Sequence, residues 1–154
     1  MSSLLQRLLV LILAGGPLRA ELMHVELSVG GLDCISCAQS VDRILKKIKG
    51  VDTASFRTQD AVAILDLKPG NAVTLDQIRD AVKGIGYTPG VAKVTARGQA
   101  REEGGKWLFR LSGSDIEYRL EIAGQAADMG VTSILEGSIA GPAAPLKVAK
   151  IRRE

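Results

Sequence analysis

The two cysteines of the chain lie three residues apart, where one periodic pattern ends and another begins. Residues 22–29 alternate between apolar and polar side chains, which predicts a half-buried strand. Its core face would carry Met23, Val25, Leu27 and Val29. Apolar residues then recur at helical spacing, at Val41, Ile44, Leu45 and Ile48. Because the residues before a helix lie close to its first turn, Cys34 and Cys37 can present two sulfurs to one metal ion.

The segments that follow predict the rest of one domain. We expect strands at 53–59 and 62–67, a second helix from 75 to 85 and a further strand at 91–96. Thr74 and Gln77 form the pattern of a capping box before the second helix. The order strand, helix, strand, strand, helix, strand predicts an α+β, ferredoxin-like sandwich over residues 21–97, with two helices on one face of an antiparallel sheet.

The character of the sequence changes after residue 97. Residues 98–105 are polar and rich in glycine, which indicates a linker or a long turn. Strand-like segments follow at 106–111, 116–122, 131–139 and 146–151, so we expect a small all-β, barrel-like domain over residues 106–154. A domain of this size buries little apolar surface alone, so we expect contact between the two halves.

The first twenty residues have the pattern of an export signal. Arg7 precedes an apolar run at 8–14, and Gly15-Gly16-Pro17 follows it. We expect cleavage after Ala20 and a periplasmic or secreted protein. The apolar run is too short to span a bilayer. An amphipathic N-terminal helix is the alternative.

Composition excludes several functions. The formal charge of +3 includes two arginines within residues 1–20, so the remainder is nearly neutral, and it has one Trp and two Phe. These features argue against nucleic-acid binding. His24 is the only histidine, and no phosphate-binding glycine loop is present, so we expect a protein that is not an enzyme. Strand alternation places His24 on the polar face, away from the cysteines.

The motif Gly31-Leu32-Asp33-Cys34-Ile35-Ser36-Cys37, with Gly50-Val51 and Gly86-Tyr87, resembles the heavy-metal-associated domain over residues 22–96. This family includes copper chaperones, domains of metal-transporting P-type ATPases and the exported mercury-binding protein of mercury-resistance systems, which is the most similar in layout. The resemblance implies one metal ion held by Cys34 and Cys37, with Tyr87 facing the loop.

Two positions depart from the usual family pattern. Leu32 stands where the family usually has methionine, and Asp33 before the first cysteine resembles the ATPases that move zinc, cadmium or lead. The C-terminal strands resemble a small oligonucleotide/oligosaccharide-binding barrel, in strand count and glycine spacing alone.

Coordination chemistry favours some ions over others. Two thiolates suit Cu(I) and Hg(II), which accept near-linear coordination, and a helix N-terminus favours thiolate over thiol. Zn(II) and Cd(II) are the alternatives, because Asp33 could supply one oxygen while a partner or water supplies the rest.

These features predict an exported metallochaperone or scavenger, a monomer in its apo form. It would pass one soft metal ion to a membrane transporter or another thiol protein. Arg43, Lys46 and Lys47 would dock that partner, or would simply form a solvated helix face. One alternative is a thiol-disulfide redox protein that uses the same cysteines. The other is a metal-sensing interaction module in which the β-rich half recognises a partner.

Overall fold

The computed structural model describes residues 21–32, 35–122 and 130–154. The expected export signal therefore lies outside the described residues, as do Asp33 and Cys34. Two helices and eight strands are described in chain order: β1 (Glu21–Gly30), α2 (Ile35–Lys46), β2 (Val51–Arg57), β3 (Val62–Leu67), α3 (Leu75–Gly84), β4 (Thr88–Glu103), β5 (Lys106–Leu111), β6 (Glu117–Glu121), β7 (Thr132–Ile139) and β8 (Leu146–Arg153).

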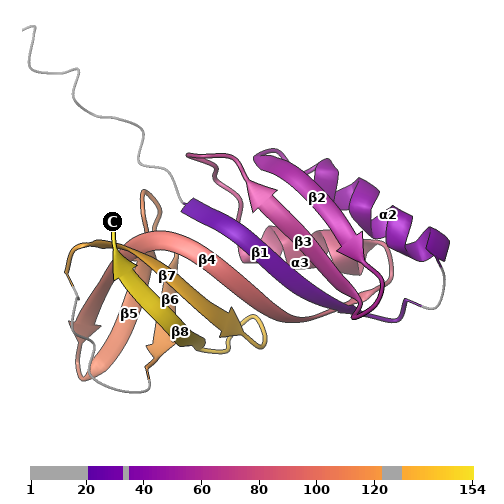
Figure 1. Ribbon diagram of the computed structural model, residues 1–154. Coiled ribbons are helices and arrows are strands. Elements are labelled where there is room, and N and C mark those ends of the chain that lie inside the picture. Colours follow the sequence, from indigo (N-terminus) through magenta and orange to yellow (C-terminus); the bar gives the residue numbers. More distant parts are fainter. Residues whose placement is uncertain (1–20, 33–34, 123–129) are drawn as a thin grey trace, which may run out of the picture.

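The N-terminal half has the expected mixed α+β order. Its strands pair in the order β2-β3-β1-β4, and every pairing is antiparallel. The two helices contact each other and lie on the same side of these strands (Figure 1). This is the ferredoxin-like arrangement that the element order predicts.

The helices form where the sequence supplies an apolar stripe and a start signal. Val41 and Leu45 of α2 are fully buried, as are Ile78 and Val82 of α3. The capping box predicted before α3 is present. The Thr74 hydroxyl accepts a hydrogen bond from the Gln77 amide at 3.1 Å, and the Gln77 side chain accepts one from the Thr74 amide at 3.0 Å.

A bulge in β1 changes one predicted side-chain direction. Leu22 pairs with Ala96 while His24 pairs with Thr95, so Met23 is an extra residue in the ladder. Because an extra residue reverses the alternation, Leu22 is buried at 1% exposure and Met23 is only half-buried. Strict alternation places Met23 on the core face, and the structure corrects that prediction.

The segment expected to be a linker continues a strand. Residues 98–103 belong to β4, and Gly104 and Gly105 form a two-residue hairpin turn to Lys106. Both glycines have positive φ, at 58° and 74°, as such turns require. The polar, glycine-rich composition reflects this turn and the exposed side chains of a strand, rather than a flexible connection.

One long strand joins the two halves (Figure 1). β4 pairs with β1 as far as Arg97 and with β5 from Gly98 onward, while β7 lies along its other edge from Ala92 to Gln99. Gly98 permits this exchange because a Cβ there would lie 2.2 Å from the Arg110 carbonyl oxygen. Pairing with β7 covers an edge of the sheet that would otherwise be open.

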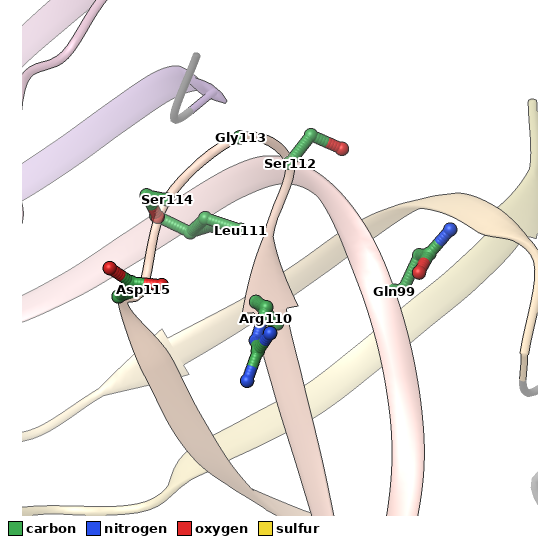
Figure 2. A pocket seen from close by; sticks show the side chains of 7 residues that line it. All are labelled: Gln99, Arg110, Leu111, Ser112, Gly113, Ser114 and Asp115. Atoms are coloured by element: carbon green, nitrogen blue, oxygen red, sulfur yellow. The ribbon is translucent and has the colours of Figure 1, made fainter. Parts of the chain in front are cut away.

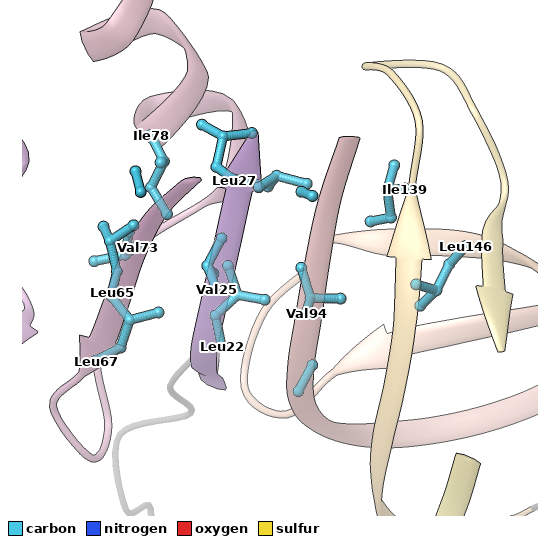
Figure 3. Packing of buried hydrophobic residues seen from close by; sticks show 14 of the residues in the cluster. Leu22, Val25, Leu27, Leu65, Leu67, Val73, Ile78, Val94, Ile139 and Leu146 are labelled. Atoms are coloured by element: carbon cyan, nitrogen blue, oxygen red, sulfur yellow. The ribbon is translucent and has the colours of Figure 1, made fainter. Parts of the chain in front are cut away.

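The C-terminal strands close a ring of pairings through β4. The order is β4-β5-β6-β8-β7 and back to β4, with β6 and β8 parallel and the other pairs antiparallel. A continuous apolar core runs through both halves, from Ile78 and Leu65 through Val94 to Ile139 and Leu146 (Figure 3). The expected contact between the halves is therefore a shared strand and a shared core.

Candidate metal site at the start of α2

The expected metal loop joins β1 to α2. β1 ends at Gly30, and Gly31 has a φ of 86°, which turns the chain away from the sheet. Leu32 is half-buried and packs against the core, so the loop is anchored on its N-terminal side. α2 begins at Ile35. The two residues between, Asp33 and Cys34, lie outside the described residues.

Cys37 lies in the first turn of α2 and is half-buried. It is disulfide-bonded, and Cys34 is the only other cysteine in the sequence. A sulfur in a disulfide is not a thiolate, so metal binding through this cysteine would first require reduction of the bond. The first turn of α2 carries no acidic residue that would oppose a thiolate there.

Tyr87 lies beside the N-terminal end of the loop. It follows α3, and its amide donates to the Val82 carbonyl oxygen at 3.3 Å, which fixes the end of that helix. A Cβ built on Gly31 would lie 3.9 Å from Tyr87 Cδ1, so the ring packs close to the loop backbone. The ring also packs against the core. Tyr87 therefore packs both beside Gly31 and against the core, and an accessory role at a metal site stays a prediction.

His24 has a partner that sequence reasoning missed. Its Nδ1 lies 2.7 Å from Asp66 Oδ1, and Thr53 donates to Asp66 Oδ2 at 2.8 Å. The hydrogen bond from His24, followed by that from Thr53, lowers the pKa of the Asp66 carboxyl below its ordinary value. His24 and Asp66 are direct partners across β1 and β3. Only the strand register, which the sequence did not supply, could have revealed the pair.

The basic residues expected to dock a partner are exposed near the end of α2. Arg43, Lys46 and Lys47 all face solvent. Lys46 pairs with Asp42 one turn earlier, at 2.8 Å. Of these three residues, Arg43 and Lys47 keep their charge for the docking role, which stays a prediction.

Within the described part of the chain, no three side chains of His, Cys, Asp or Glu gather at metal-binding distance. A polar hollow of about 470 Å³ lies at the β5–β6 turn, beside Arg110 and Asp115 (Figure 2), and its lining contains no cysteine or histidine. The described helices are all too short or too polar to cross a membrane.

The fold and the loop define a class of protein. Residues 26–88 match the family model of the heavy-metal-associated domain. The match confirms, for this segment, the resemblance to the heavy-metal-associated domain that the sequence suggests. None of the curated proteins compared with the chain matches it.

Several solved structures are similar to the same part of the chain. The CopZ metallochaperone is 26% identical, and the match covers 43% of this chain and 97% of that one, with a TM-score of 0.40. The N-terminal domain of a potential copper-translocating P-type ATPase from Bacillus subtilis is 23% identical, with coverage of 45% and 85% and a TM-score of 0.41. The yeast copper transporter domain Ccc2a is 24% identical, with coverage of 44% and 90% and a TM-score of 0.41.

Proposed function

We propose that the chain is a metallochaperone or scavenger that binds one soft metal ion through the reduced thiols of Cys34 and Cys37. The proposal rests on the match of residues 26–88, a segment that includes both cysteines, to the heavy-metal-associated domain. The position of Cys37 in the first turn of α2 supports it, because backbone amides there favour a thiolate.

Cu(I) is the ion that this ligand set suits best, with Hg(II) next. Both accept two sulfur ligands in a near-linear arrangement. Zn(II) and Cd(II) call for more ligands, of which Asp33 offers one oxygen and a partner protein or water the others. An ion held by two thiolates is open to attack by a partner's thiolate. Stepwise exchange of sulfur ligands would therefore pass the ion to a membrane transporter or another thiol protein, with Arg43 and Lys47 attracting an acidic docking surface.

We further propose export as the setting of this chemistry, with cleavage after Ala20 and a periplasmic or secreted location. The composition of residues 1–20 supports this proposal. In an oxidising compartment the thiols need metal or a reductant to remain reduced. We also propose that the chain is not an enzyme and that its apo form is monomeric.

Thiol-disulfide exchange is the second candidate function, and the disulfide of Cys37 favours it. In that reaction a substrate thiolate attacks one sulfur of the bond and releases the other as a thiolate, giving a mixed disulfide. A second substrate thiol completes the transfer, so the protein gains two electrons and the substrate becomes a disulfide. The same cysteines serve both functions, so only measurement separates them.

A double substitution, C34S with C37S, tests the metal proposal. We expect the anaerobic, reduced protein to bind one equivalent of Cu(I) in competition with a chelator, and the variant to bind none. Ser55→Ala, on the exposed surface of β2, is the matched control and should keep full binding. Binding that survives in the double variant would sink the proposal.

A further inference from the structure

A cleft separates the first turns of α3 from the C-terminal strands. Its volume is about 600 Å³, and its walls come from α3, β6 and the loop after β7. Leu75 and Leu108 make part of the lining apolar, while Arg79 and Tyr118 bring polar groups into it. The cleft does not include any residue of the metal loop. It is large enough for a small organic molecule rather than only an ion.

Arg79 is the unusual feature of this cleft. Its side chain is 2% exposed, although arginine is almost never buried without a charged partner. Nη2 donates to the Ile139 carbonyl oxygen at 3.0 Å and to the Gly90 carbonyl oxygen at 3.3 Å, and both acceptors are neutral. Arg79 forms no ion pair with any residue in the described ranges.

Arg79 has no carboxylate in direct contact, because the nearest counter-charge, that of Asp76 one turn earlier on α3, acts on it without forming an ion pair. The guanidinium therefore keeps hydrogen-bonding capacity that no described side chain uses. Burial lowers the pKa of Arg79 from its ordinary value, but a guanidinium stays protonated in proteins. Nε and Nη1 have no acceptor among the described residues, and Arg79 lines the cleft. The guanidinium meets water only through this cleft, so an anion that enters the cleft interacts with it under weaker screening than at an open surface.

The remaining charges of the cleft leave an excess of one cation. Glu117 lies on the wall, but Arg110 and Arg101 hold it at 2.8 Å and 2.9 Å. The ionised groups left over are Arg79, Arg119 and Asp76. Burial raises the pKa of Tyr118 to about 12, so its hydroxyl stays neutral and can donate a hydrogen bond.

We propose that this cleft binds a small organic carboxylate, with its anionic group on the guanidinium of Arg79 and its apolar part against Leu75 and Leu108. A carboxylate is planar and matches the fork of a guanidinium with two parallel hydrogen bonds. The apolar lining favours a ligand with a short hydrocarbon tail over a fully hydrated inorganic ion. The proposal is independent of metal binding, since the two sites share no residue.

Titration of the full chain with butyrate tests the proposal, with butyramide as the neutral molecule of the same shape. The readouts are the side-chain Nε–H resonance of Arg79 and the ring resonances of Tyr118 in nuclear magnetic resonance spectra. We expect both to shift in a saturable way with butyrate and to stay in place with butyramide. Equal shifts with both molecules, a linear response to butyrate, or tighter binding of inorganic phosphate would overturn the proposal.

Substitutions locate the response. Arg79→Gln should weaken butyrate binding by at least about tenfold, because a hydrogen-bonded ionic contact is lost. Arg57→Gln removes an exposed arginine that pairs with Asp60 outside the cleft, and should leave the affinity unchanged. If Arg79→Gln does not fold, Ala143→Phe replaces it as the test. Ala143 is an exposed loop residue of the lining, and a ring there should block the cleft and abolish the saturable shift. Unchanged butyrate affinity in the folded variant would contradict the assignment.

Discussion

Cys37 sets the chemistry of the metal loop through its redox state. As a disulfide its sulfur is neutral and is a poor ligand for a soft ion, and as a thiolate it lies where helix amides stabilise negative charge. Under the proposed function, the redox state of this residue would determine whether the loop binds metal or exchanges disulfides. Asp33 and Tyr87 would modify this chemistry, but neither replaces a thiolate as a ligand for Cu(I).

Asp66 links acid stability to the pair that it forms with His24. The pKa of its carboxyl is lowered from 3.8, so the stabilisation is fully present above pH 3.8 and is lost as the pH falls through the lower, folded value. Both side chains are partly exposed, so we expect Asp66→Asn to cost only about 0.5 kcal/mol near neutral pH.

Urea unfolding of the protein and the Asp66→Asn variant, near neutral pH and below pH 3.8, checks this expectation. The free energy difference between the two should shrink as the pH falls. The difference is the relevant quantity because Asp60 and Glu117 also have lowered pKa values and titrate in the same range. A difference that stays constant with pH would show that the His24–Asp66 pair contributes nothing to acid stability.

Among the secondary-structure elements, β4 connects the ferredoxin-like sheet to the ring of C-terminal strands. Its first part is the fourth strand of the ferredoxin-like sheet, and its last part begins the C-terminal ring. At Gly98 the pairing partner of β4 changes from β1 to β5. The β4 and β5 backbones approach there too closely for a side chain on Gly98. This glycine is thus required by packing rather than by backbone flexibility.

Gly98→Ala should lower the free energy of unfolding by about 1–3 kcal/mol, because the new methyl group overlaps the Arg110 carbonyl and the Phe109 ring. Gly141→Ala is the matched control, since its Cβ would meet no atom within 4 Å, and it should be nearly neutral. Thermal or urea unfolding measures both. Equal stability of the two variants would contradict the role given to Gly98.

The elements of the first half could be predicted from sequence because each had a local signal. Apolar periodicity and the Thr74 capping box specify α3 locally, and the cysteine motif places the start of α2. The bulge at Met23 and the full length of β4 depend on pairing between distant strands, so no local pattern specified them. Arg79 was missed for the same reason. It borders the apolar stripe of α3, but only the packing of the C-terminal strands buries it.

Both halves share β4 and a continuous apolar core, so we expect the described residues to fold and unfold as one unit. Leu135 on β7 is fully buried beside Ala96 of β4, its partner in the ladder. A truncation after Arg97 would divide β4 and remove β7 from its edge, so we do not treat residues 21–97 as an independently folding unit. Metal binding and any partner contact of the C-terminal strands are best compared in the full chain.

Cooperative unfolding follows from the shared core. The fluorescence of Trp107, the only tryptophan in the sequence, reports on unfolding of the C-terminal strands. Hydrogen exchange of the β1 and α2 backbone amides reports on unfolding of the N-terminal half. We expect both probes to give the same urea midpoint. Leu135→Ala should move both midpoints together, at a cost of about 2–5 kcal/mol. Two separate midpoints would show that the halves unfold independently.

Anaerobic titration of the full chain with Cu(I) against a competing chelator, in its reduced and its disulfide forms, decides whether Cys34 and Cys37 bind metal. We predict that the reduced form binds one ion and that both thiols then become unreactive, while the disulfide form binds none. Binding of equal strength in both forms, or a reduced form that loses every competition and simply returns to the disulfide, would contradict metal handling by Cys34 and Cys37.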